Sequence, residues 1–102
     1  MIKLFVSTPV QYNLTEKEIE EVISRYEELA HATEIKLGRY CEVEHYAVSY
    51  CSSGSKEDFI GNCLYDLRYA NYAVFADKWE TCDECVIMHK IAELIGIPIL
   101  EL

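Results

Sequence analysis

Short apolar runs alternate with longer amphipathic segments along this chain. Residues 2–7 are mostly apolar and are followed by Thr8 and Pro9, where proline ends regular structure. This run predicts a buried first strand. Thr15 and Glu18 have the Thr-x-x-Glu spacing of a capping box, which predicts a helix that ends at Gly38. Its apolar positions recur at the helical period: Ile19, Val22, Ile23, Tyr26, Leu29 and Ala30.

The middle of the chain predicts a second strand and a second helix. Residues 42–50 alternate between two sides, which is typical of a strand and fits an edge position. Residues 55–58 carry a weaker capping signal. The helix that they open has apolar residues at helical spacing: Ile60, Cys63, Leu64 and Leu67.

The last third of the chain repeats the alternation once more. Residues 72–76 predict a third strand. Thr81 and Glu84 then have capping-box spacing, so we expect them to open a helix that stops at Gly96. Residues 97–102 complete the pattern as a fourth strand.

Strands that alternate with helices are joined by right-handed crossovers into a mostly parallel sheet. We therefore expect one α/β domain over residues 1–102, doubly wound and Rossmann- or flavodoxin-like. Its sheet should have about four strands in the order 2-1-3-4, with three helices. In such sheets a ligand binds at the carboxyl ends of the strands, where the strand order reverses. Residues 7–11 and 77–81 should converge at that point.

Charge and composition exclude several classes of binding partner. Nine Lys and Arg residues against eighteen Asp and Glu residues give a net charge of −9, which opposes binding to nucleic acid polymers and anionic membranes. No stretch approaches the roughly 20 apolar residues of a membrane span, and the first residues lack the apolar core of a signal peptide. We expect a cytoplasmic protein whose five cysteines are mostly reduced core residues.

Residues from both predicted site segments resemble the nucleoside 2-deoxyribosyltransferase superfamily, in particular a small bacterial and phage branch of it. The resemblance extends over nearly the whole length, from a strand that closes in Ser-x-Pro to a last helix followed by a Gly-Ile strand. The matching residues are Ser7, Pro9, Ala70, Trp79, Glu80, Cys85, His89, Ala92, Gly96 and Ile97.

The resemblance implies a nucleoside or nucleotide ligand and N-glycosidic cleavage or deoxyribosyl transfer, in which a glutamate on the last helix attacks the anomeric carbon. That glutamate falls on Met88 in this chain, and a thioether is no anionic nucleophile. Asn71 and Glu84 stand where the branch has Asp and Gly. No metal or organic cofactor is implied.

If the chain is an enzyme, Glu84 is the candidate nucleophile and Asp77 the candidate orienting or proton-transferring group. Alternatively, Glu84 only closes the capping box, and the protein is a non-catalytic binding or assembly protein that has kept the fold. The residues expected to contact the ligand are Ser7, Thr8, Pro9, Trp79, Met88 and His89.

Three other patterns have alternative interpretations. Cys82 and Cys85 have the Cys-x-x-Cys spacing of thiol redox proteins, and with His89 they form a stripe that invites a metal interpretation. Incidental helix cysteines are the competing explanation. Residues 52–55 fit either ordinary capping or binding of a phosphate at a helix start.

Eight tyrosines are more than a small core easily covers with satisfied hydroxyls, so we expect some at the interface of a homodimer or higher homo-oligomer. They include Tyr46, Tyr50, Tyr65, Tyr69 and Tyr72.

Overall fold

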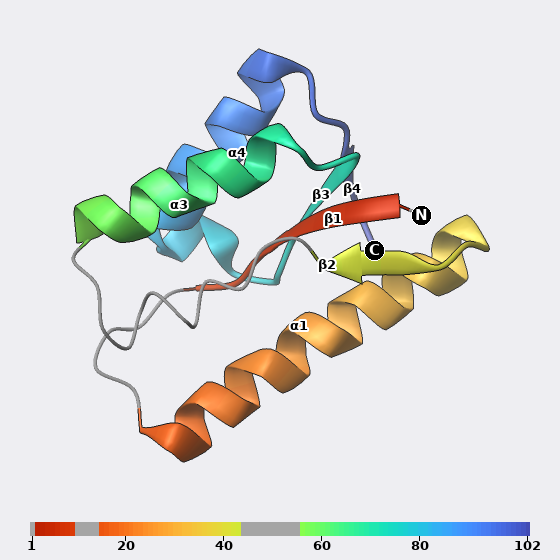
Figure 1. Ribbon diagram of the computed structural model, residues 1–102, viewed down its shortest axis with the longest axis horizontal. Coiled ribbons are helices and arrows are strands. Elements are labelled where there is room, and N and C mark those ends of the chain that lie inside the picture. The colour runs from red at the N-terminus through yellow and green to blue at the C-terminus, as the bar shows by residue number, and fades with distance from the viewer. Residues whose placement is uncertain (1, 10–14, 44–55) are drawn as a thin grey trace.

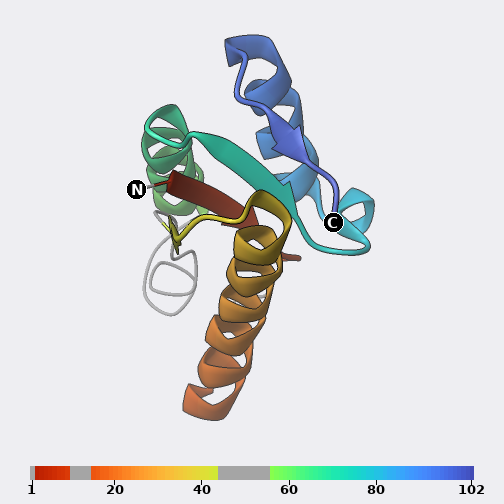
Figure 2. The ribbon, with the colours of Figure 1, turned by 90° about the vertical axis from the view of Figure 1, so that its right-hand side faces the viewer.

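Four parallel strands form the sheet of this protein, in the order β2-β1-β3-β4. The computed structural model describes residues 2–9, 15–43 and 56–102. Helix α1 covers one face of the sheet, and helices α3 and α4 cover the other (Figures 1 and 2). The predicted doubly wound α/β class and the strand order 2-1-3-4 are therefore confirmed. The elements are β1 (Ile2–Ser7), α1 (Glu16–Leu37), β2 (Cys41–Val43), α3 (Lys56–Arg68), β3 (Tyr72–Phe75), the 3₁₀ turn η1 (Trp79–Thr81), α4 (Asp83–Ile95) and β4 (Ile99–Leu100).

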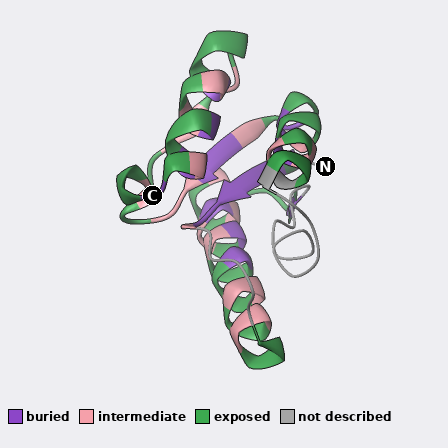
Figure 3. Cartoon of the chain, turned by 90° about the vertical axis from the view of Figure 1, so that its left-hand side faces the viewer, coloured by how far each residue is buried: buried purple, intermediate pink, exposed green. Residues whose placement is uncertain are grey.

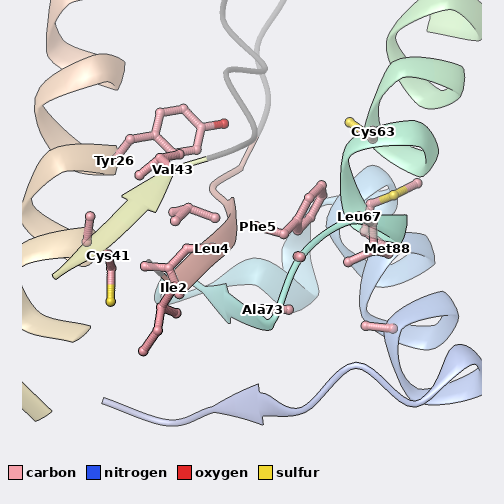
Figure 4. Close-up of a cluster of buried hydrophobic side chains, with 14 residues drawn as sticks. Ile2, Leu4, Phe5, Tyr26, Cys41, Val43, Cys63, Leu67, Ala73 and Met88 are labelled. Carbon is pink, nitrogen blue, oxygen red and sulfur yellow. The ribbon is translucent and has the colours of Figure 1, made fainter. Parts of the chain in front are cut away.

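Strand β1 lies in the middle of the sheet and is buried on both faces. Leu4 and Phe5 each have 0% exposure. Successive side chains of a strand point to opposite faces, so these two residues are buried on different sides of the sheet. Leu4 lies on the α1 side with Tyr26, whereas Phe5 points toward Leu67 and Met88 on the α3 and α4 side (Figure 4). The core is therefore divided in two by the sheet, and residues of β1 contribute to both halves.

The ends of α1 and α4 follow from local signals. The Glu18 backbone N–H donates to Thr15 Oγ1 and the Thr15 N–H donates to Glu18 Oε1, both at 3.2 Å, so the predicted capping box is confirmed. The Thr15 N–H, and after it the Thr15 hydroxyl, donate to the Glu18 carboxylate and lower its pKa. Gly38 and Gly96 end the two helices at φ of 67° and 82°, in the left-handed region that glycine adopts without strain.

The predicted capping box of Thr81 and Glu84 is wrong. The Thr81 hydroxyl donates back to the Lys78 carbonyl at 2.6 Å, within the 3₁₀ turn η1. Helix α4 begins one residue later than that box requires, with Cys82 as its N-cap and no side-chain capping bond. The hydroxyl that suggested a helix start thus stabilises the preceding turn.

The strands are shorter than the apolar runs that predicted them. Ile97 does not join the sheet, because its N–H donates to the Ala92 carbonyl at 2.9 Å and closes the end of α4. Pro98 follows and offers only its carbonyl, which accepts from Ala73 N–H at 2.9 Å. Strand β4 is reduced to two residues, and β3 ends at Phe75. Of the second predicted strand, residues 44–50 lie outside the described residues.

Buried residues are concentrated in the strands and on the inner faces of the helices (Figure 3). Within the described part of the chain, no helix has the length and apolar character needed to cross a membrane.

Replacement of Thr15 by Ala should lower the free energy of unfolding by about 1 kcal/mol, because the Glu18 N–H then loses its capping acceptor. Thr15→Ser keeps the hydroxyl and should lie close to the parent. Chemical denaturation followed by circular dichroism measures both. Equal losses in the two variants would show that the hydroxyl does not cap α1.

Candidate ligand site at the carboxyl ends of the strands

The carboxyl ends of β1 and β3 border a cavity of about 470 Å³, which we call the switch-point crevice. It lies between these strand ends and the middle of α1, at the point where strand order reverses. The structure therefore brings together the two segments that the sequence predicted to converge, as far as they are described. The lining residues are Thr8, Pro9, Arg25, Glu28, Leu29, Ala76, Asp77, Lys78 and Thr81.

The pairing of β1 with β3 sets the geometry of the crevice. Ser7 lies opposite Phe75, and the Ala76 N–H donates to the Ser7 carbonyl at 2.9 Å. The segments that follow β1 and β3 then leave the sheet side by side, and Thr8 and Ala76 line neighbouring walls of the crevice. Because successive side chains alternate, Thr8 reaches the α1 side while Ser7 faces α4.

Ser7, expected to contact the ligand, is instead buried against α4. Its hydroxyl donates to Cys85 Sγ at 3.2 Å, and Cys85 Sγ donates to the Thr8 carbonyl at 3.2 Å. Ser7 is 6% exposed and does not line the crevice. These bonds attach the end of β1 to α4, and Ser7 and Cys85 position Thr8 without lining the crevice.

Met88, the residue at the family's nucleophile position, lies in the hydrophobic core. Its side chain is 1% exposed and packs among Phe5, Leu67 and the other core residues between α4 and the sheet (Figure 4). The crevice opens on the opposite face, beside α1. The expectation that Met88 contacts a ligand is therefore corrected, because the sheet lies between this side chain and the crevice.

The two candidate catalytic carboxylates lie in different places. Asp77 is exposed and lines the crevice. Glu84 lies on the first turn of α4, where its Oε2 accepts a hydrogen bond from Cys82 Sγ at 3.3 Å, and it does not line the crevice. Asn71 precedes β3 at the amino ends of the strands, away from the crevice, where its N–H donates to the Lys3 carbonyl at 2.8 Å. Of these three positions, only Asp77 belongs to the crevice.

Trp79 and His89 form the wall of a second hollow of about 370 Å³, which we call the aromatic hollow. Their rings stack with centroids 4.0 Å apart and an interplanar angle of 3°, and Phe75 packs against both. His89 Nδ1 lies 3.1 Å from Glu93 Oε1. Asp77 and Lys78 line this hollow as well as the crevice. Trp79 and His89 therefore lie beside the crevice and outside its lining.

Lys78 has an unusual backbone conformation. Its φ of 66° makes it the only non-glycine residue with positive φ in the described part of the chain. A lysine in the left-handed region costs roughly 1 kcal/mol relative to the ordinary helical region. The turn from β3 into η1 imposes this conformation, and the same turn places Lys78 on the crevice.

Cys85 does not have the environment of a reactive redox thiol. Desolvation raises the pKa of the Cys85 thiol to about 12, and the neighbouring Cys82 and Glu84 add to the shift, against a lowering by the Ser7 hydroxyl. Redox cysteines need a low pKa and access to solvent. All four cysteines in the described part are buried thiols, as expected of reduced core residues.

The predicted metal stripe, phosphate site and interface tyrosines place no described residue in the crevice. Residues 2–9, 15–43 and 56–102 contain no cluster of three or more His, Cys, Asp or Glu side chains suited to a metal ion. The phosphate interpretation of residues 52–55 concerns residues outside the described ranges. Tyr65 and Tyr69 are exposed and pack on Arg68, whose guanidinium carbon lies 5.2 and 4.6 Å from their ring centroids.

The sequence did not single out Arg25, Leu29 or Lys78 as site residues. Leu29 is one of the apolar positions that predict α1, and Arg25 is not among them. The signal that would have found Arg25 is its i, i+4 spacing to Leu29, which puts the two on the same side of α1. Lys78 follows Asp77 directly at the predicted site, but its conformation leaves no mark in the sequence.

Comparison of the chain with protein-family models, with curated proteins and with solved structures gives no match.

Substitution of Met88 tests whether this side chain is a core residue. Met88→Leu should cost less than about 1.5 kcal/mol of unfolding free energy, since the volume is kept. Met88→Ala should cost about 2–5 kcal/mol. Met88→Glu should cost more than about 3 kcal/mol, because an unpaired carboxylate enters the core. Urea denaturation gives all three values, and a Met88→Glu protein as stable as the parent would show that the side chain faces water.

Cys85 should resist alkylation in the folded protein. With a pKa of about 12, roughly one thiol in ten thousand is ionised at pH 8, and the thiol is also buried. Iodoacetamide labelling with peptide mass spectrometry should modify Cys85 only after denaturation. Since its folded pKa is raised, this thiol favours the folded state below pH 9, and that contribution is lost as the pH rises from about 9 toward 12. Rapid labelling at pH 8 would contradict both statements.

Proposed function

We propose that this protein binds a nucleoside or nucleotide-like small molecule in the switch-point crevice. The observation that carries the proposal is a cavity of about 470 Å³ at the reversal point of a parallel sheet. Ligand cavities of proteins fall in this size range, and open α/β sheets bind their ligands at this position.

The lining of the crevice suits a molecule with one flat apolar part and several hydroxyls. Pro9, Leu29 and Ala76 supply an apolar wall against which a base can lie. Glu28 and Asp77 supply carboxylate oxygens, which accept hydrogen bonds from sugar hydroxyls. The resemblance to the deoxyribosyltransferase superfamily supports a nucleoside in particular, since Pro9 of its Ser-x-Pro motif lies on this cavity.

On this proposal the family's nucleophilic step does not take place from α4. Met88 is a thioether in the core, and the described carboxylates of α4 do not line the crevice. The protein is then a binding protein that uses the α1 side of the fold. The expected homodimer stays a prediction, with Tyr40, Tyr65 and Tyr69 as the exposed tyrosines among the described residues.

One observation favours a second candidate function, N-glycosidic cleavage. Two carboxylates, Glu28 and Asp77, line the same crevice from different elements. Glycoside hydrolysis uses a pair of carboxylates, one to supply or accept a proton and one to act on the anomeric carbon or on water. In this alternative Asp77 keeps a catalytic role and Glu28 replaces Glu84 as its partner.

Titration with 2′-deoxynucleosides and their 5′-monophosphates, followed by NMR of the ¹⁵N-labelled protein, tests binding. The amide signals of Thr8, Ala76 and Thr81 should shift, because these residues line the crevice. Ala76→Phe should weaken binding at least about tenfold by filling the cavity. Val86→Phe adds the same ring on the exposed side of α4 and should leave binding unchanged. Saturable shifts confined to α3 and α4 would contradict the proposal.

Chromatography of the same mixtures after long incubation distinguishes the two candidate functions. The binding proposal predicts that the nucleosides stay intact. Release of free base would favour cleavage, and that activity should then fall about 10²–10⁴-fold in Asp77→Asn and in Glu28→Gln. Cleavage that survives both substitutions would exclude the Glu28 and Asp77 pair.

A further inference from the structure

We propose that the ligand of the switch-point crevice carries a phosphate monoester, which Arg25 and Lys78 hold. This inference rests on the proposed function and narrows its ligand from nucleosides in general to those with a phosphate. Arg25 comes from α1 and Lys78 from the turn after β3, so the two cations reach the crevice from different elements.

Basic residues are concentrated at the crevice. The chain has nine basic residues against eighteen acidic ones, yet two of the nine line this single cavity. Within residues 2–9, 15–43 and 56–102, neither Arg25 nor Lys78 forms an ion pair with a carboxylate. Glu28 and Asp77 balance the two cations, so the crevice is formally neutral in a protein of net charge −9.

The aromatic hollow next to the crevice is more acidic than the crevice itself. Asp77, Glu80 and Glu101 line it, against Lys78 and the imidazole of His89. A dianionic group is repelled by such a surface and is favoured beside unpaired cations. Of the two cavities that share Asp77 and Lys78, the crevice is therefore the one that suits an anion.

The backbone of Lys78 is strained. Glycine and asparagine adopt a φ near 66° more easily than other residues do. The lysine side chain cannot form the local hydrogen bond that stabilises asparagine in this conformation. Strain of this kind is typical of positions whose side chain has a task. Because Lys78 lines the crevice, the task that fits its ammonium group is to hold an anion.

The chemistry of the two side chains is complementary. Arginine presents a planar set of donors that matches two phosphate oxygens, and lysine adds a compact positive charge. Glu28 and Asp77 remain available as acceptors for sugar hydroxyls. A ligand with hydroxyls at one end and a phosphate at the other uses all four groups.

Isothermal titration calorimetry with each 2′-deoxynucleoside and its 5′-monophosphate tests the inference. The monophosphate should bind at least about tenfold more tightly than the nucleoside at low salt, and the advantage should shrink as salt is added. Deoxyribose 5-phosphate and inorganic phosphate show whether the phosphate alone is sufficient for binding. Tight binding of inorganic phosphate with no gain from the nucleoside part would overturn the assignment of the ligand as a phosphorylated nucleoside.

Variants at position 78 distinguish the effect of the lysine charge on binding from the effect of the backbone strain on stability. Lys78→Asn suits the left-handed conformation and removes the charge, so it should melt no lower than the parent and lose the preference for the monophosphate. Lys78→Arg should keep the preference, and Arg25→Gln should lose it. Lys90→Gln removes the charge of an exposed lysine of α4, keeps the helix propensity, and should change neither the melting temperature nor the preference for the monophosphate.

The outcomes distinguish this inference from the proposed function. If nucleoside and monophosphate bind equally and Lys78→Asn has no effect, the phosphate anchor is wrong and the nucleoside crevice stands. If neither ligand binds, the proposed function itself fails. If Lys78→Asn or Arg25→Gln keeps the preference for the monophosphate, the substituted residue does not hold the phosphate.

Discussion

The structure depends on the burial of β1 between two parallel neighbours. Leu4 and Phe5 are fully buried on opposite faces, so helices must cover both sides of this strand. Pairing of Ser7 with Phe75 then fixes where β1 and β3 leave the sheet, and that exit point is the floor of the crevice. The position of the site is thus a consequence of how the central strand is buried, because the strand ends cannot move without losing core contacts.

Burial on two faces also gives the two sides of the sheet different roles. On the α4 side, Phe5, Leu67 and Met88 fill the interior, and the hydrogen bonds of Cys85 to Ser7 and Thr8 hold the end of β1 in place. On the α1 side the cavity remains beside the strand ends. A carboxylate on α4 therefore has no short path to the ligand, whereas side chains of α1 border it directly.

Much of the fold could be predicted from the sequence, because its signals are local. The Thr15 box, the terminating Gly38 and Gly96, and the alternation of apolar runs are each readable within a few residues. The start of α4 was misjudged because the Thr81 hydroxyl bonds backward to Lys78. The crevice was located only in part: Thr8, Pro9 and Asp77 follow predicted strands, but Arg25 and Lys78 depend on tertiary packing and a backbone angle that no sequence pattern encodes.

The central claim is that the ligand lies on the α1 face of the sheet and not beside α4. Intermolecular nuclear Overhauser effects between a bound deoxynucleoside 5′-monophosphate and methyl-labelled protein test it most directly, since they require distances of a few ångströms. Our account predicts contacts from the ligand to the Leu29 and Ala76 methyl groups and none to the Met88 methyl. Contacts to Met88 without contacts to Leu29 would contradict it.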